Sequence, residues 1–236
     1  MDFALTPRCE EYREKLLAFM DEKVYPAEPE FEAELEASGN PHAHTKVMED
    51  LKAEARKRGL WNLFHPHKEW GPGLTNAEYA PLAEIMGRSF IAPEACNCNA
   101  PDTGNMEVLT MFGTPEQQEE FILGGFARER RVAFGLTEPD HGSDATHMET
   151  VAVRETRDGV PGWRIDGRKM WITGMHVATH CAAFCRTSGK AGDAKGITCL
   201  LVPAGTPGMV VDEYLWTFNM PTDHPRMHFE NCWVPD

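Results

Sequence analysis

The feature that most constrains this chain is a change in hydrophobic pattern near Gly124 and Gly125. Before it, apolar residues recur every three to four positions, the spacing of one face of an amphipathic helix. After it, short segments rich in β-branched, aromatic and cysteine residues alternate with turns, which is typical of strands. A chain of 236 residues is long enough for two ordinary domains. We therefore predict a helical domain over residues 1–128 and a β domain over residues 129–236.

Helix-capping and helix-breaking residues divide the first half into five predicted helices. The first is expected to begin at Thr6 and Pro7, because proline is tolerated at the first helical position, and to end at Pro26. The other four are expected from Thr45 to a stop at Gly59, from Asn76, over residues 102–112, and from Thr114. The acidic stretch 28–36 is interpreted as a solvated linker or helix face without a function of its own.

The second half is expected to form an antiparallel, barrel-like sheet, because its candidate strands are short and separated by turns. The pair Asp166 and Gly167 predicts a tight hairpin, since glycine accepts the positive φ of a two-residue turn. The stretch 181–185 is interpreted as a buried strand. The predicted fold class is α+β, an all-α domain followed by an antiparallel β-barrel-like domain.

Net charge and hydropathy exclude several classes of function. The formal charge of −14 and the lack of clustered Lys and Arg argue against a nucleic-acid partner. Residues 1–131 hold 14 Lys and Arg against 24 Asp and Glu, and residues 132–236 hold 9 against 13, so an anionic ligand meets less repulsion in the second half. No apolar run is long enough to span a membrane and no secretory signal opens the sequence, which predicts a cytoplasmic protein.

The seven cysteines are interpreted as reduced thiols, since their number is odd and no CxxC pair occurs. His176 and His180 lie four residues apart beside Cys181, a spacing that resembles a metal-binding helix face. No third and fourth ligand stand at usable spacing, and the following stretch is strand-like. We therefore predict no metal site.

Two segments of the β half carry the chemistry. Residues 134–144, PheGlyLeuThrGluProAspHisGlySerAsp, form a strand that ends in a loop, where Pro139 removes a backbone donor and Gly142 permits an unusual backbone angle. Hydroxyls and amides of this loop can therefore turn toward a ligand. Residues 166–174, AspGlyArgLysMetTrpIleThrGly, form the second segment.

In order and spacing, the two segments resemble the signature of the acyl-CoA dehydrogenase family, in which a strand ending in Thr-Glu-Pro precedes a loop ending in Gly-Ser-Asp. Residues 200–208 and the closing stretch 229–235 are also similar to the family's β domain. Upstream, residues 79–89 and 97–109 look like the branch that contains human family members ten and eleven and their bacterial relatives. The resemblance covers nearly the whole chain.

The resemblance implies that FAD binds along these segments. Thr137 would offer a hydroxyl to the pyrimidine end of the isoalloxazine, Trp171 would pack against the flavin face, and Thr173 would hydrogen-bond near N5. A flat apolar ring with a polar edge suits such an aromatic wall with a few placed donors. Taken alone, Trp171 is better interpreted as a core tryptophan of an antiparallel sheet, and only its place beside Thr173 and the first segment favours the flavin role. The predicted cofactor-binding residues are Phe134, Leu136, Thr137, Gly142, Ser143, Trp171, Ile172 and Thr173.

The resemblance also implies how a substrate would meet this chain. Ser143 is similar to the family serine that contacts the CoA part of the thioester, although a turn-capping role is compatible with it. Side chains of residues 103–109 resemble the wall of the acyl pocket, and ordinary core is the alternative interpretation. His141 replaces a small residue common in the family and receives no role.

The family reaction removes a proton beside the thioester carbonyl and passes a hydride to flavin N5. Its base is a glutamate of a third, helical domain, which we expect beyond Asp236, so no residue here is predicted to be catalytic. Glu138 is interpreted as a structural turn residue. By resemblance, the expected partners are an acyl-CoA thioester, an electron-transfer flavoprotein as electron acceptor, and further copies in a homo-oligomer.

Two other functions stay open at this point. A non-catalytic flavin or acyl-CoA binding module, or a partner subunit of a complete homologue, would bind without turnover. A flavin monooxygenase or oxidase on the same scaffold would reoxidise its reduced flavin rapidly with oxygen. The Gly-Ser-Asp loop favours the thioester reaction over the second of these.

Overall fold

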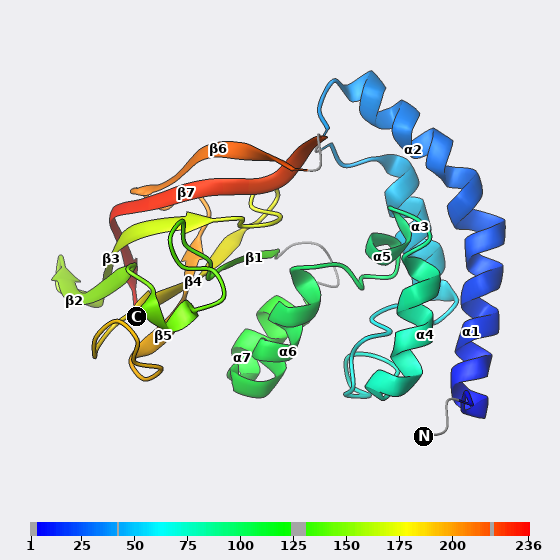
Figure 1. Ribbon diagram of the computed structural model, residues 1–236, viewed down its shortest axis with the longest axis horizontal. Helices are drawn as coiled ribbons and strands as arrows, with labels where there is room; N and C mark the ends of the chain where they lie inside the picture. The colour runs from blue at the N-terminus through cyan, green and yellow to red at the C-terminus, as the bar shows by residue number, and fades with distance from the viewer. Residues whose placement is uncertain (1–3, 42, 124–130, 218–219) are drawn as a thin grey trace. The chain divides into compact units, whose positions relative to one another are not determined.

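The computed structural model describes residues 4–41, 43–123, 131–217 and 220–236. The chain divides into two compact units, Met1–Phe112 and Gly113–Asp236, each of which has its own core. The units are coloured from blue to green and from green to red in Figure 1. The predicted domain boundary after residue 128 lies outside the described residues.

A long helix of mixed geometry opens the first unit. Its parts are α1 (Pro7–Phe19), a π-helical segment (Met20–Val24) and α2 (Tyr25–Ser38). The prediction that Pro26 ends this helix is wrong. Pro26 stands in the first turn of α2, where a helix tolerates a missing N–H, so the chain passes from π to α geometry without ending. The acidic stretch 28–36 lies on α2, and most of its side chains are exposed.

The remaining helices of the first unit are α3 (Lys46–Lys57), α4 (Asn76–Met86), α5 (Ala92–Ala95) and α6 (Asp102–Phe112). The predicted starts are confirmed for α3, where the Thr45 hydroxyl accepts from the Met48 amide at 3.3 Å, and for α4, where Thr75 and Glu78 form a capping box. The apolar faces of α1 to α5 meet in one core, which includes Leu16, Phe19, Leu51, Leu82, Met86 and Ala92.

The second unit begins with a short helical segment and continues as one curled, mixed sheet. The helical segment is α7 (Pro115–Gln117) with a π-helical continuation (Gln118–Leu123). The strands within the described residues are β1 (Val132–Gly135), β2 (Val151–Arg157), β3 (Val160–Met170), β4 (His180–Arg186), β5 (Ile197–Pro203), β6 (Met209–Thr217) and β7 (Met220–Pro235). The predicted helical domain followed by a barrel-like β domain is confirmed.

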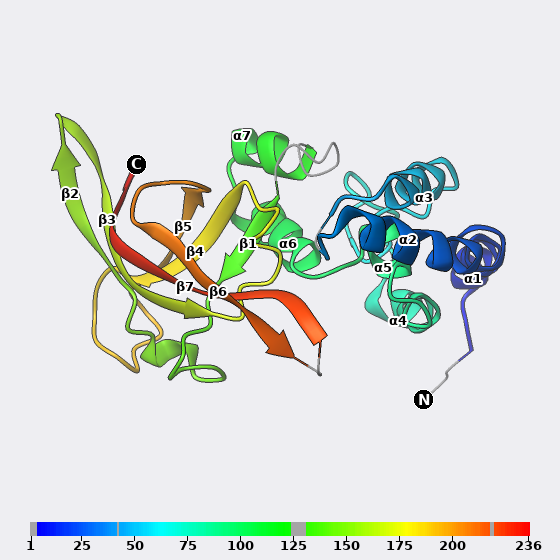
Figure 2. The same cartoon turned by 90° about the horizontal axis from the view of Figure 1, so that it is seen from above.

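Most neighbouring strands pair antiparallel, as expected, along the order β1-β4-β2-β3-β7-β6, with β5 paired to β4. The exceptions both involve β4: β1 runs parallel to it and pairs Phe134 with Ala182, and β2 runs parallel to it through the pair Val151 and Arg186. A residue at the end of β1 therefore leaves the sheet in the direction in which β4 runs. Figure 2 shows the β2 and β3 hairpin projecting from the sheet, and β6 and β7 lying side by side.

The predicted hairpin at Asp166 and Gly167 is wrong. The turn between β2 and β3 is formed by Asp158 and Gly159, both with positive φ, whereas Asp166 and Gly167 lie inside β3. There the ladder to β7 shifts register, and a Cβ on Gly167 would lie 2.4 Å from the Thr150 Oγ1 atom. Glycine is therefore needed for a close approach of two backbones at a β-bulge and not for a turn.

The core of the second unit lies inside the curled sheet. It includes Ala133, Ile165, Cys181, Cys185, Val202 and Phe229. These side chains come from strands on every side of the curl, so the sheet closes on its own apolar face. In the described part of the chain, no helix has the length and apolar character needed to cross a membrane.

Candidate functional site

The two signature segments meet where β1 and β3 end. The Met170 amide donates a hydrogen bond to the Thr137 carbonyl at 2.9 Å, and the Lys169 ammonium donates to the Leu136 carbonyl at 3.1 Å. Thr137 and Trp171 therefore leave the sheet from adjacent strand ends. Two segments that are some thirty positions apart in the sequence form one local surface.

A buried ion pair lies directly beneath this junction. The Lys169 Nζ atom is 2.8 Å from Glu138 Oε1, and both side chains are almost completely buried. Glu138 also accepts from the Thr150 amide at 3.0 Å and from the Glu149 amide at 2.6 Å. Burial alone would raise the pKa of Glu138, but the hydrogen bonds from Lys169, Thr150 and Glu149 outweigh it and lower the pKa. Glu138 is therefore a fully bonded anchor inside the unit, in agreement with its interpretation as a structural residue.

Trp171 projects from a strained backbone. Its φ is +64°, a left-handed conformation that bulky residues rarely adopt, and its side chain is 43% exposed. The next side chain, Ile172, returns to the core. Trp171 is thus not the core tryptophan of the alternative interpretation, whereas the side chain of Ile172, also predicted to bind the cofactor, is buried.

The other predicted residues fall into two groups. Phe134, Leu136 and Thr137 are partly buried at the end of β1, where the Phe134 ring lies 4.8 Å from that of Phe184, centroid to centroid. Gly142 and Ser143 lie on the exposed loop that follows, and a Cβ on Gly142 would meet open space. Within the described residues, the hydroxyls of Thr137 and Ser143 have no hydrogen-bonding partner, and no hydrogen bond joins Ser143 to the Trp171 segment.

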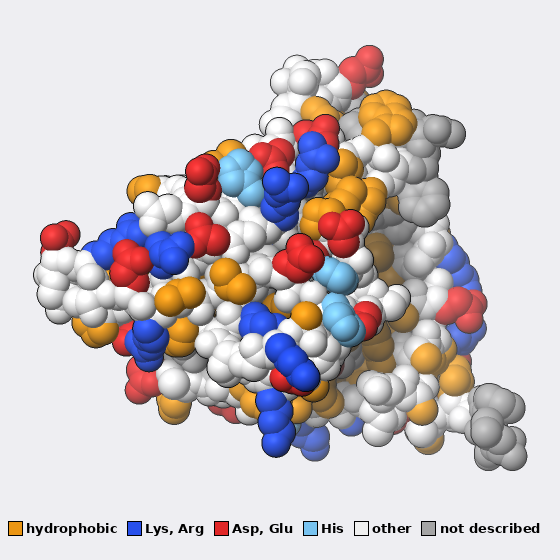
Figure 3. Space-filling model, turned by 60° about the vertical axis from the view of Figure 1, so that its left-hand side comes forward, with side chains coloured by type: hydrophobic (Ala, Val, Ile, Leu, Met, Phe, Trp, Pro, Cys, Tyr) orange, Lys and Arg blue, Asp and Glu red, His pale blue; other side chains and the backbone are white. Residues whose placement is uncertain are grey.

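The loop that carries Ser143 is closed by local hydrogen bonds. The Glu138 amide donates to the His141 carbonyl at 3.1 Å, and Asp144 accepts from His147 Nδ1 at 2.5 Å. The rings of His141 and His147 stack at 6.0 Å, and His141 Nε2 lies 3.7 Å from a Glu149 oxygen. His141 therefore has carboxylate and imidazole neighbours in its own loop. Figure 3 shows acidic, basic, histidine and apolar side chains interspersed on the face it draws.

Sequence reasoning missed Arg186, which fixes the following turn. This buried guanidinium donates to the carbonyl oxygens of Thr146 at 2.5 Å, Asp193 at 3.2 Å, Ser188 at 3.3 Å and Lys195 at 3.4 Å. It thereby joins the turn after the signature loop to the loop between β4 and β5. Its signal in the sequence is a lone charged residue at the end of a buried strand.

Lys169 and His224 were also missed. Lys169 follows Arg168 in a strand that contains other charged residues, so the sequence does not mark it as the one with a buried carboxylate partner. The Nδ1 atom of His224 lies 2.9 Å from the Thr173 hydroxyl, and nothing in the sequence connects residues 51 positions apart. The His224 ring contacts the Thr173 side chain of the second signature segment, and the Lys169 ammonium donates to Leu136 and Glu138 of the first.

The cysteines are free thiols in the structure. Burial raises the pKa of Cys181 and of Cys185 to about 12, so neither ionises near neutral pH. Among the residues that the structure describes, no group of three or more His, Cys, Asp or Glu side chains could hold a metal ion.

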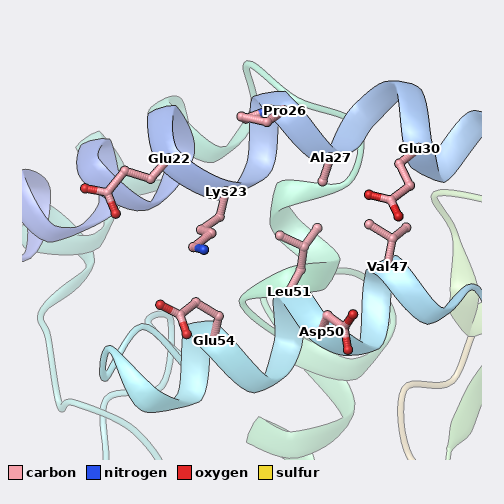
Figure 4. A pocket seen from close by; sticks show the side chains of 9 residues that line it. All are labelled: Glu22, Lys23, Pro26, Ala27, Glu30, Val47, Asp50, Leu51 and Glu54. Atoms are coloured by element: carbon pink, nitrogen blue, oxygen red, sulfur yellow. The ribbon is translucent and has the colours of Figure 1, made fainter.

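The first unit contains a cavity of about 410 Å³ between the long opening helix and α3. Figure 4 shows the apolar side chains of Ala27, Val47 and Leu51 between the two helices, with Lys23 between the carboxylates of Glu22 and Glu54. The residues that line it are Glu22, Lys23, Pro26, Ala27, Glu30, Val47, Asp50, Leu51 and Glu54. Four carboxylates against one ammonium disfavour a phosphate-bearing ligand, so we do not place the FAD or CoA site here.

Two family models match the chain: the acyl-CoA dehydrogenase N-terminal domain over residues 6–129 and the acyl-CoA dehydrogenase middle domain over residues 133–232. The chain is 43% identical over 244 residues to the probable acyl-CoA dehydrogenase FadE2 of Mycobacterium tuberculosis, with 100% of the chain and 58% of that protein covered. It is 38% identical over 242 residues to acyl-CoA dehydrogenase family member 10 of Mus musculus, with 98% and 22% covered. The chain spans less than two thirds of the length of these relatives.

Solved structures give the same result. A putative acyl-CoA dehydrogenase from Mycobacterium abscessus superposes with a TM-score of 0.83 at 38% identity, over 98% of this chain and 60% of that chain. A glutaryl-CoA dehydrogenase from Mycobacterium smegmatis, solved in complex with FADH2, has the same fold, with a TM-score of 0.67 at 22% identity, over 98% of this chain and 54% of that chain. The chain therefore belongs to the acyl-CoA dehydrogenase family of oxidoreductases and comprises its N-terminal and middle domains.

Proposed function

We propose that this chain forms the flavin-contacting part of an FAD-dependent acyl-CoA dehydrogenase that introduces a double bond between the α and β carbons of an acyl-CoA thioester. The observation that carries the proposal is the junction of the two signature segments, from which Trp171 projects, exposed, on a strained backbone. Backbone strain of this kind is found mainly at functional sites, and an exposed indole is not held in place by core packing. The two features together are characteristic of a binding surface.

The residues at the junction suit an isoalloxazine. Trp171 offers a flat apolar face, Phe134 and Leu136 offer apolar contacts at the strand end, and the unpartnered Thr137 hydroxyl offers a hydrogen bond to the polar edge. Bound FAD would supply the hydride acceptor of the reaction. The protein would bind the ring, orient it and exclude water from one of its faces. Gly142 and Ser143 leave an open approach for a phosphate-bearing chain.

The proposed partners follow from the same surface. Ser143, with its free hydroxyl, is proposed to hydrogen-bond the CoA part of the substrate, and an electron-transfer flavoprotein is proposed to accept the electrons. We assign the general base to no residue described here. Glu138, the carboxylate inside the first signature segment, is buried and accepts hydrogen bonds from three donors. A homo-oligomer is the proposed assembly. These assignments rest on the family to which the chain belongs.

The test is a flavin titration followed by substrate addition. The purified chain is titrated with FAD under anaerobic conditions, and saturated or unsaturated acyl-CoA thioesters are then added while the visible spectrum is recorded. Bleaching by saturated thioesters alone supports the dehydrogenase. Flavin binding without bleaching supports the flavin-contacting role alone, since no residue described here is assigned as the base, and failure to bind FAD contradicts the proposal for this chain.

A pair of tryptophan variants locates the binding surface. Trp171→Leu is expected to weaken FAD binding about 2- to 13-fold, because stacking on an aromatic ring contributes about 0.5–1.5 kcal/mol beyond the area it buries. Trp216→Leu is the matched control, since Trp216 is a 65% exposed tryptophan of β6 outside the signature segments. Equal FAD affinities of the two variants would contradict the assignment of Trp171.

A further inference from the structure

The stretch after β3 is held against β7 by two backbone hydrogen bonds that flank Thr173. The Ile172 amide donates to the Pro225 carbonyl at 3.2 Å, and the Gly174 amide donates to the Asp223 carbonyl at 3.1 Å. The two bonds continue the antiparallel pairing of β3 with β7 beyond its last ladder residue. Thr173 is thereby fixed opposite the residue between Asp223 and Pro225.

That residue is His224, and its ring contacts two oxygen atoms. The His224 Nδ1 atom lies 2.9 Å from Thr173 Oγ1 and 3.2 Å from an Asp223 carboxylate oxygen. All three side chains are partly buried, so water competes less for these contacts than at an open surface. The carboxylate and the hydroxyl oxygen thus both approach the same ring nitrogen.

The carboxylate decides the direction of the chain of hydrogen bonds. An ionised Asp223 can only accept, so a proton on His224 Nδ1 is favoured. The one hydrogen of a protonated Nδ1 then lies between the Asp223 carboxylate and the closer Thr173 Oγ1, so the hydroxyl oxygen accepts and keeps its own hydrogen for another acceptor. With the proton on Nε2 instead, Nδ1 would accept from Thr173 and compete with any ligand for the hydroxyl hydrogen.

We infer that His224, oriented by Asp223, is a positioning residue that makes the Thr173 hydroxyl a hydrogen-bond donor to the bound flavin. The inference rests on the proposed function, because it takes the acceptor to be the N5 edge of the isoalloxazine. N5 of an oxidised flavin carries a lone pair and accepts such a bond. His224 acts through Thr173 and has no contact with substrate in this role.

The experiment is a double-mutant cycle on the FAD dissociation constant and on the midpoint potential of the bound flavin. His224→Leu removes the donor, Thr173→Val removes the hydroxyl, and the double variant removes both. Each single variant is expected to bind FAD about 3- to 10-fold more weakly, the range that one neutral hydrogen bond gives. The double variant is expected to bind no more weakly than Thr173→Val, because His224 acts only through that hydroxyl.

Two further variants separate positioning from structure. His224→Asn keeps an N–H donor near the place of Nδ1 and is expected to restore most of the affinity and the midpoint potential. His228→Leu removes a second imidazole of β7, whose Nδ1 lies 2.7 Å from an Asp212 oxygen, and is expected to leave both quantities unchanged. Thermal melting of every variant checks that the β unit is still folded.

The outcomes distinguish the inference from the proposed function. The inference is overturned if His224→Leu weakens FAD binding by the same factor whether residue 173 is threonine or valine. It is also overturned if His224→Leu leaves both the FAD dissociation constant and the midpoint potential unchanged. In both cases the unmodified chain still binds FAD, and the proposed function stands. If the unmodified chain takes up no FAD, the proposed function fails and the inference fails with it.

Discussion

Replacement of Lys169 by methionine tests whether the buried ion pair holds the two flavin segments together. The Lys169 ammonium is fully buried and lies 2.8 Å from Glu138 Oε1 and 3.1 Å from the Leu136 carbonyl. Lys169→Met retains the length of the side chain but leaves the Glu138 carboxylate buried without its counter-charge. Removal of one partner of a buried pair costs about 3–5 kcal/mol.

The lower part of that range applies here, because two backbone amides still donate to Glu138 after the substitution. A loss of about 3 kcal/mol lowers the folding equilibrium constant about a hundredfold. The double variant Glu138→Gln, Lys169→Met removes both charges and is expected to be more stable than Lys169→Met alone. Urea unfolding at pH 7, followed by tryptophan fluorescence, gives both free energies of unfolding.

The pH dependence of unfolding provides a second check on the same pair. The lowered pKa of Glu138 means that the ionised form stabilises the fold above the ordinary glutamate pKa of about 4.3, and that this stability is lost as the pH falls through the lower folded-state pKa. In Lys169→Met the burial of Glu138 remains while its main partner is gone, so its pKa is expected to rise. The difference in free energy of unfolding between Lys169→Met and the unmodified chain should therefore become smaller as the pH falls from 7 to 5.

The control is Arg226→Met, which removes an ion pair with Glu213 whose side chains are about half exposed. Such a pair contributes little, and the free energy of unfolding should change by about 0.5 kcal/mol or less. The reasoning is refuted if the free energies of unfolding of Lys169→Met and of the unmodified chain differ by less than 1 kcal/mol, a limit well below the expected loss. It is equally refuted if the double variant is less stable than Lys169→Met.

Four further substitutions in the second unit have expected outcomes in the same unfolding assay. Trp171→Gly should lower the free energy of unfolding by about 1 kcal/mol or less, because relief of the left-handed backbone offsets the lost contacts. Trp163→Ala, at a tryptophan packed on the core, should lower it by about 3 kcal/mol or more. Similar losses in the two variants would contradict the exposed role of Trp171. Gly167→Ala should destabilise by about 1–3 kcal/mol, since its Cβ would clash with Thr150, and a neutral result would contradict the bulge geometry. Arg186→Met leaves its four carbonyl partners without this donor and should lower the free energy of unfolding by about 2 kcal/mol or more. Proteolysis of the loop after Ser143 should become faster. An unchanged proteolysis rate would show that Arg186 does not hold that loop.

Local signals in the sequence predicted most of the helical unit. The caps at Thr45 and Thr114 act through side-chain contacts within three residues, so a sequence pattern contains everything that determines them. The error at Pro26 has the opposite cause. A π turn just before the proline changes the register of the helix, and no local residue pattern marks that change.

Long-range pairing explains what could not be predicted in the second unit. Asp166 and Gly167 satisfy the composition of a hairpin turn, but the register of β3 against β7 places them at a bulge. Lys169 and Arg186 could be recognised only as charged residues of predicted strands, and their partners come from other parts of the chain. The signature residues themselves were found in the sequence, while the supports beneath them required the fold.

The backbone around Trp171 explains why this surface keeps its shape before a ligand arrives. A left-handed tryptophan costs about 1–3 kcal/mol and persists only where its neighbours are fixed. Here the amide on one side donates to Thr137 and the amide on the other side donates to Pro225, so the kink is held from two different strands. The kink sends the indole outward and returns Ile172 to the core, which anchors the segment. If FAD is the ligand, as we propose, its binding would require little reordering of this segment, and more of the interaction energy would appear as affinity.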